Sequence, residues 1–111
     1  SMVRPIPRRL LIHTIDYKRL AGNNGWDDEF DEPIKITGVR VMPASRIHRT
    51  AQSESSEATH RVIIDRQHSK PFLEPLEGSR IIWRGKEFTV GKVSAHYDFS
   101  ETPHHYEVEL W

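Results

Sequence analysis

The chain has 111 residues, of which 36% are hydrophobic and 29% charged, which suffices for one modest core and not for two. Lys and Arg together number 16, as do Asp and Glu, and this neutral balance argues against non-specific nucleic-acid binding as the main role. The absence of cysteine excludes disulfides, thiolate metal sites and cysteine nucleophiles, and no apolar run is long enough to span a membrane. We therefore expect one domain over residues 4–111 with no membrane contact, and we interpret Ser1 as a remnant of expression.

The first expected strand covers residues 10–15, and Pro5 and Pro7 keep the segment before it extended. Residues 1–26 carry five basic residues and one acidic residue, whereas residues 27–57 carry four basic and seven acidic. This polarity favours contacts between copies of the chain over contacts with a highly charged polymer. The acidic run after the expected turn at residues 22–25 lacks the spacing of a calcium loop, so we interpret it as a solvated loop or else as a charged interface patch.

The second expected strand, residues 34–41, changes phase at Gly38. Ile34 and Ile36 share one parity, whereas Val39 and Val41 share the other. One extra residue at the glycine returns all four side chains to one face, as in a β-bulge, and bulges bend the strands of small barrels.

The window from Arg46 to His60 has too few apolar residues for an amphipathic helix. We expect residues 46–58 to form a mobile loop between two strands, with its most polar part at residues 51–57. A structureless loop of this length is often functional, although its composition equally suits plain solvent-exposed chain.

Further strand signals complete the pattern. Residues 61–65 are a short β-branched run, and residues 80–93 are typical of a hairpin with its turn at Gly85–Lys86. Residues 105–111 alternate, with Tyr106, Val108 and Leu110 on one face. Because helix signals are scarce, the sequence predicts an all-β fold: a small bent antiparallel β-barrel with a long polar loop between strands.

The candidates for chemistry are few. His96 and Asp98 on one strand, with His104 or His105 on the next, are the candidate ligands of a metal-dependent enzyme. Adjacent histidines on a strand point to opposite faces, so only one of that pair can join the other ligands. Metalloprotease spacing, a nucleophile elbow and a phosphate-binding glycine loop are all absent from the sequence. We therefore favour surface histidines and expect no enzyme, no cofactor and no catalytic or metal-binding residue.

Aromatic residues suggest an alternative function. Trp83, Tyr97 and Phe99 would stack on bases if a barrel exposed them, as in nucleic-acid-binding barrels of the oligonucleotide-binding or SH3-like type. Trp83 lies beside two isoleucines in the expected hairpin, so core packing is the better interpretation for that residue.

Four segments, in order along the chain, resemble the phage minor capsid protein family. They are residues 4–13 (RPIPRRLLIH), 36–43 (ITGVRVMP), 78–90 (GSRIIWRGKEFTV) and 104–108 (HHYEV), and together they span nearly the whole chain. The resemblance implies a structural protein of the head–tail connector of a tailed phage or prophage, of the stopper (head-completion) type. Similar connector proteins are small β-barrels that dock as a ring below the portal and adaptor and help to retain packaged DNA.

The same resemblance implies partners and sites. The partners are other copies in a ring, the portal or adaptor, tail proteins and, passively, packaged DNA. The implied location is the head–tail junction of the virion, and before assembly the cytoplasm of the bacterial host. By position alone, the loop that closes the channel corresponds here to Arg46, His48, Arg49, Gln52, Ser53, Glu54, Ser55, Ser56 and Glu57. The basic start and the acidic run are the expected subunit interface, formed by Arg8, Arg9, Asp27, Asp28, Glu29, Asp31 and Glu32.

Overall fold

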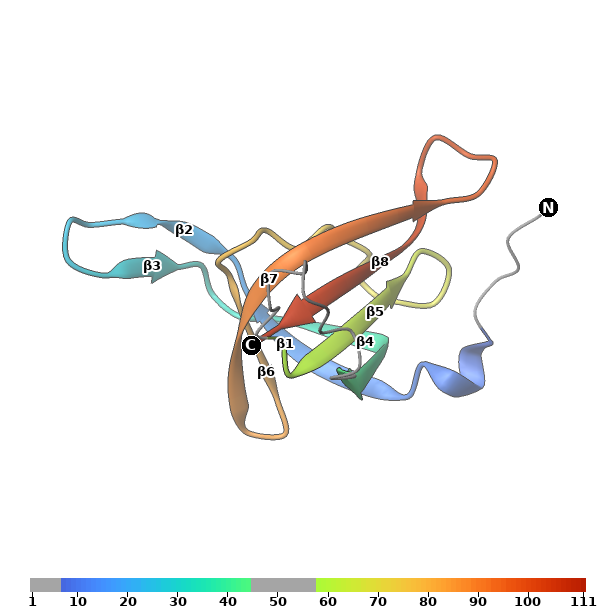
Figure 1. The fold of residues 1–111 in the computed structure, drawn as a ribbon, viewed down its shortest axis with the longest axis horizontal. Helices are drawn as coiled ribbons and strands as arrows, with labels where there is room; N and C mark the ends of the chain where they lie inside the picture. The colour runs from blue at the N-terminus through green and yellow to red at the C-terminus, as the bar shows by residue number, and fades with distance from the viewer. Residues whose placement is uncertain (1–6, 45–57) are drawn as a thin grey trace, which may run out of the picture.

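The computed structural model describes residues 7–44 and 58–111 (Figure 1). Its elements are a 3₁₀ helix at Arg8–Leu10 and strands β1 (His13–Lys18), β2 (Leu20–Asn23), β3 (Asp28–Phe30), β4 (Ile34–Pro43), β5 (His60–Asp65), β6 (Arg80–Trp83), β7 (Lys86–Tyr97) and β8 (Pro103–Leu110). Strands β1-β4-β5-β8-β7-β6 close into an antiparallel barrel, and β2 and β3 form a separate hairpin. The predicted all-β barrel is therefore confirmed. Within the described ranges, no helix is long and apolar enough to cross a membrane.

The barrel interior is filled by the inward side chains of all six of its strands. Strand β8 shows the rule most clearly, because burial alternates along it and Tyr106, Val108 and Leu110 face the core as predicted. The fully buried side chains are mostly β-branched, which suits a curved, pleated surface. The core cluster consists of Ile15, Tyr17, Ile36, Val39, Val41, Val62, Ile64, Ile81, Phe88, Val90, Tyr106, Val108 and Leu110.

The predicted bulge lies at Gly38. The pairing of β1 with β4 passes from His13 opposite Val39 to Thr14 opposite Thr37, which leaves Gly38 as the extra residue. Its φ of +71° is the left-handed conformation that glycine adopts without strain. Ile36, Val39 and Val41 are buried as the phase change predicts, whereas Ile34 is 41% exposed because it is the first residue of the strand, at the end of the barrel.

Three local predictions were wrong. The first strand begins at His13 and not at Leu10, because local hydrogen bonds from the Leu10 and Leu11 amides close a 3₁₀ turn. The β6–β7 turn residues are Arg84 and Gly85, with φ of 52° and 77°, since a tight two-residue hairpin turn takes positive φ at both positions. Residues 22–25, expected as a turn, and the acidic run after them, interpreted as a solvated loop or a charged interface patch, instead contribute to the paired strands β2 and β3.

Candidate functional site

The acidic run lies on the β2–β3 hairpin, which projects from the barrel (Figure 1). We call this segment, residues 20–32, the acidic hairpin. Its acidic side chains are all exposed, and they are Asp27, Asp28, Glu29, Asp31 and Glu32. Trp26 at the tip is 89% exposed, although nothing in the sequence pattern drew attention to it. A protruding segment that combines negative charge with one large aromatic ring is a surface suited to protein contact.

Two asparagines build the tip of the acidic hairpin. The Oδ1 atom of Asn24 accepts hydrogen bonds from the backbone N–H groups of Trp26 and Asp27, both at 2.9 Å. The Oδ1 atom of Asn23 accepts one from the N–H of Gly25 at 2.8 Å, and Gly25 has φ +98°. These short side-chain bonds satisfy backbone groups that the turn leaves unpaired, so the tip is ordered by its own sequence.

The base of the acidic hairpin is attached to the barrel. The hydroxyl oxygen of the buried Ser79 accepts a hydrogen bond from the N–H of Leu20 at 2.8 Å. The ring of Phe30 lies under two cations, with Arg80 4.9 Å and Lys18 5.5 Å from its centroid. The hairpin is therefore held in a defined position relative to β1 and β6.

The basic residues of the expected subunit interface lie away from the acidic hairpin. Arg8 and Arg9 are exposed on the 3₁₀ helix, and Figure 1 places this helix and the acidic hairpin at opposite ends of the longest axis. Neither arginine forms an ion pair with another residue of the described ranges. The seven expected interface residues thus divide into two surfaces of opposite charge that do not meet within one molecule.

The expected channel loop, residues 46–58, lies outside the described residues except for Ala58, so the structure places only the residues at either side of segment 45–57. Pro43 of β4 is paired with His60 of β5, and the N–H of Ala44 donates to the carbonyl of Thr59 at 2.9 Å. The described residues on the two sides of segment 45–57 are therefore held next to each other, on neighbouring strands.

Positively charged side chains lie near this junction of β4 and β5. Arg84 lies 4.5 Å from the ring of Trp83, whose ring contacts both His13 and His60. Lys86 lies 5.4 Å from the ring of Phe88, which also contacts His60. Trp83 packs against the core, as predicted. We call these two cations and Arg40, whose charge acts on His13 together with that of Arg84, the basic rim.

Burial and the charges of the basic rim lower the pKa of two neighbouring histidines. Burial is the larger cause that lowers the pKa of His13, and the charges of Arg40 and Arg84 lower it further. Burial likewise lowers the pKa of His60, with Lys86 as the second cause. These residues come from strands far apart in the sequence, so sequence patterns did not reveal the rim.

The candidate metal ligands are only partly brought together. His96 of β7 lies opposite His105 of β8, and Glu107, which the sequence reasoning missed, completes a group whose ligand atoms lie within 4.8 Å of one another. His104 is buried and does not join the group, as expected for one of two adjacent histidines. Asp98 does not join the group.

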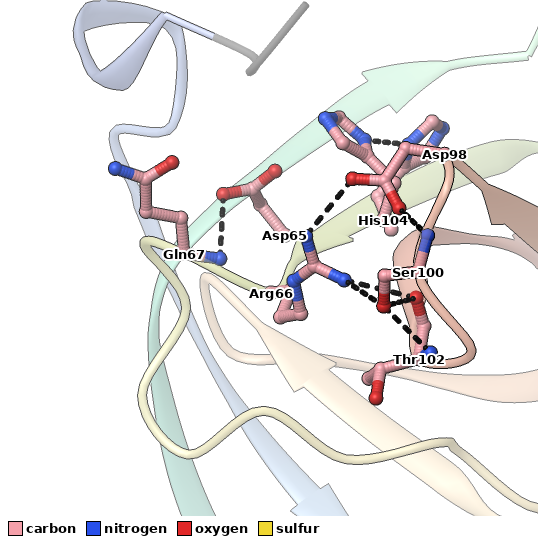
Figure 2. Close-up of polar contacts among 8 residues, drawn as sticks. Asp65, Arg66, Gln67, Asp98, Ser100, Thr102 and His104 are labelled. Atoms are coloured by element: carbon pink, nitrogen blue, oxygen red, sulfur yellow. Dashed lines mark hydrogen bonds and ion pairs between the residues drawn. The ribbon is translucent and has the colours of Figure 1, made fainter. Parts of the chain in front are cut away.

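Asp98 instead holds the β7–β8 connection (Figure 2). Its Oδ2 atom lies 3.0 Å from Nη2 of Arg66, and its Oδ1 accepts the N–H of Ser100 at 2.8 Å. Arg66 also donates to the carbonyl of Thr102 at 2.9 Å. The Ser100 bond and then the Arg66 guanidinium lower the pKa of the Asp98 carboxyl. This network is structural: it fixes a connection that carries the 83% exposed Phe99.

The aromatic residues proposed for base stacking do not form one surface. Trp83 lies at the β6–β7 turn, whereas Tyr97 ends β7 at its far end, and Phe99 follows it. A continuous stacking platform of these three residues is therefore absent from the described structure.

Comparison with known proteins identifies the chain at the level of family. A model of the minor capsid protein family matches residues 7–110, nearly the whole chain. No curated protein and no solved structure matches significantly. The match covers every described strand, including the bulged β4, the β6–β7 hairpin and the closing strand β8, whose motifs carried the resemblance seen in the sequence. The chain therefore belongs to the phage minor capsid protein family.

Proposed function

We propose that this protein is a subunit of the phage head–tail connector, where copies form a ring below the portal or adaptor and help to close the DNA channel. The family gives the chain a structural role in the phage, which fits a protein without catalysis and a location in the virion. The observation that carries the finer proposal is that Ala44 and Thr59, on the two sides of segment 45–57, are joined beside the basic rim. This is the arrangement that a channel-closing segment needs.

The basic rim supports contact with packaged DNA. Arg84 and Lys86 occupy a turn and the start of a strand, and cations at such positions attract the phosphate backbone without reading sequence. The overall charge of the chain is zero, so this attraction is local and does not make the whole domain a DNA-binding module. A passive contact is what a connector requires, because the DNA must pass through it.

The opposite charges at the two ends support a ring. A contact in which the acidic hairpin of one copy meets Arg8 and Arg9 of the next is heterologous, and heterologous contacts close into rings when the rotation allows it. Opposite charges mainly steer the encounter and set the register of such a contact. We assign the portal, adaptor and tail proteins as the neighbours above and below the ring.

Deletion of residues 51–57 tests the channel function in phage particles. We expect the variant barrel to fold, with an unchanged melting temperature, while particles assembled with it release their DNA. A variant in which Gly and Ser replace residues 51–57 at the same length keeps the spacing between β4 and β5 and tests the segment if the deletion does not fold. Particles of both variants that retain DNA as the wild type does would contradict the proposal.

A further inference from the structure

We propose that His96, His105 and Glu107 form a binding site for a divalent transition-metal ion of the zinc type. The site lies on the outer face of β7 and β8, towards the end that carries the β7–β8 connection. The site does not include the basic rim or segment 45–57. A test of zinc binding therefore does not depend on whether the proposed connector function is correct.

The pairing of two strands brings the three ligands together. His96 and His105 are directly opposite each other in the β7–β8 ladder, and their rings are parallel at 4.7 Å between centroids. Glu107 is two residues after His105 on the same strand and therefore shares its face. One carboxylate oxygen, Oε2 of Glu107, lies 3.5 Å from Nε2 of His96 and 3.4 Å from Nε2 of His105.

These separations fit a tetrahedral ion. With metal–ligand bonds of about 2.0–2.1 Å, two ligands of a tetrahedral zinc lie roughly 3.4 Å apart. Both histidine–glutamate separations already have this value. The ligand atoms of His96 and His105 lie within 4.8 Å of each other, and the side chain of His96 is 46% exposed, so it has room on the solvent side to turn towards a shared ion.

A buried histidine positions one of the ligands. Nδ1 of His105 lies 2.8 Å from Nδ1 of His104, whose residue is 6% exposed (Figure 2 shows His104 beside the Asp98 network). When Nε2 of His105 binds a metal, its Nδ1 carries the proton and donates to Nδ1 of His104. A hydrogen bond to the second ring nitrogen is how proteins orient a metal-binding imidazole, so His104 is a positioning residue.

The donor set selects the ion. Two imidazole nitrogens and one carboxylate oxygen suit zinc, cobalt, nickel or copper, whereas magnesium and calcium prefer oxygen ligands throughout. The group is open to solvent on the His96 side, which leaves the fourth position to water. In the metal-free protein the carboxylate faces both Nε2 atoms, and the ion takes the place of the protons between them.

Titration calorimetry with zinc chloride at pH 7.5 tests the site on the full chain. We expect one zinc ion per chain for the wild type and at least about tenfold weaker binding for His96→Ala and for Glu107→Gln. The matched control is His68→Ala, which removes a histidine from the β5–β6 connection and should bind zinc as the wild type does. His96 is exposed, so its substitution should leave the metal-free melting temperature unchanged.

A second measurement locates the ion directly. Zinc should shift the side-chain nitrogen resonances of His96 and His105 in NMR spectra of the wild-type protein. Absence of saturable zinc binding to the wild type would overturn the proposal. So would equal zinc affinities of His96→Ala, Glu107→Gln and His68→Ala, because binding would then lie elsewhere.

Discussion

The Nδ1 atom of His13 accepts a hydrogen bond of 2.9 Å from the backbone N–H of Val41. Strand β1 begins at His13 and pairs there with Val39, so no backbone carbonyl of β1 continues the ladder to Val41. The imidazole takes the place of that missing backbone partner. Because an imidazole nitrogen accepts a hydrogen bond only when it carries no proton, this bond requires neutral His13.

Stability should therefore fall as the pH is lowered below about 6.5. The folded protein lowers the pKa of His13 from its ordinary 6.5, so the unfolded chain binds protons more readily in this range and acid favours unfolding. Burial shifts the pKa of His60 and His105 in the same direction. Melting temperatures at pH 7.0 and 5.5 measure the effect, and the lower value is expected at pH 5.5.

The variant His13→Asn isolates the contribution of this residue. Asn offers an acceptor oxygen close to the position of Nδ1 and has no proton to gain. Its melting temperature should change less between pH 7.0 and 5.5 than that of the wild type. An identical pH dependence in the two proteins would show that His13 does not contribute.

Substitution of the bulge glycine should destabilise the barrel. A Cβ at Gly38 would lie against the carbonyl oxygen of His68 closer than non-bonded atoms approach, and the φ of +71° is unfavourable for alanine. We expect Gly38→Ala to lower the free energy of unfolding by about 2–4 kcal/mol in urea denaturation. Gly22→Ala is the control, because its Cβ meets nothing within 4 Å, and a change of only about 0.5 kcal/mol or less is expected. Equal effects of the two variants would refute the steric argument.

Loss of Arg66 should loosen the β7–β8 connection without unfolding the barrel. Its guanidinium bonds the Asp98 carboxylate, the Ser100 hydroxyl and the Thr102 carbonyl, all within one exposed connection. We expect Arg66→Ala to accelerate amide hydrogen exchange over residues 98–102, with unchanged exchange in β5. Lys92→Ala removes a charge from an exposed position of β7 and should leave exchange in the connection unaltered. Unaltered exchange in Arg66→Ala as well would mean that the connection is held by other contacts.

Charge reversal tests the proposed contact between copies. The structure uses the side chains of Asp28 and Glu29 in hydrogen bonds at the hairpin tip, so reversal is best confined to Asp27, Asp31 and Glu32. We expect the triple lysine variant to fold normally, because exposed substitutions change stability by about 0.5 kcal/mol or less, and to be incorporated poorly into particles.

The complementary exchange distinguishes pairing from a general effect of charge. The double variant Arg8→Glu, Arg9→Glu should also reduce incorporation into particles. Combining this double variant with the triple lysine variant should restore part of the lost incorporation. Reversal of Lys92 to Glu serves as a control for an exposed charge outside both surfaces. Incorporation that stays low in the combined variant would argue against a contact between these two ends.

By itself the sequence determined the features that depend on neighbouring residues. Alternation along β8 predicted its buried face, and the change of parity at Gly38 predicted the bulge, because side-chain direction follows the two-residue period of a strand. The ordered motifs predicted the family that the comparison confirmed. Local signals failed at residues 8–10, where short-range hydrogen bonds close a 3₁₀ turn, and at the β6–β7 turn, where Arg84 as well as Gly85 takes a positive φ.

Only the tertiary structure decided which distant residues meet. The closure of the barrel brings Trp83 to His13 and His60, and so creates the basic rim from two separate parts of the chain, β4 and the β6–β7 hairpin. The register of β7 against β8 places His105, and not His104, opposite His96, and it adds Glu107 while Asp98 turns to Arg66. Strand periodicity determines the face on which a side chain lies, whereas the partner across the sheet depends on register and closure, which arise from packing of the whole core.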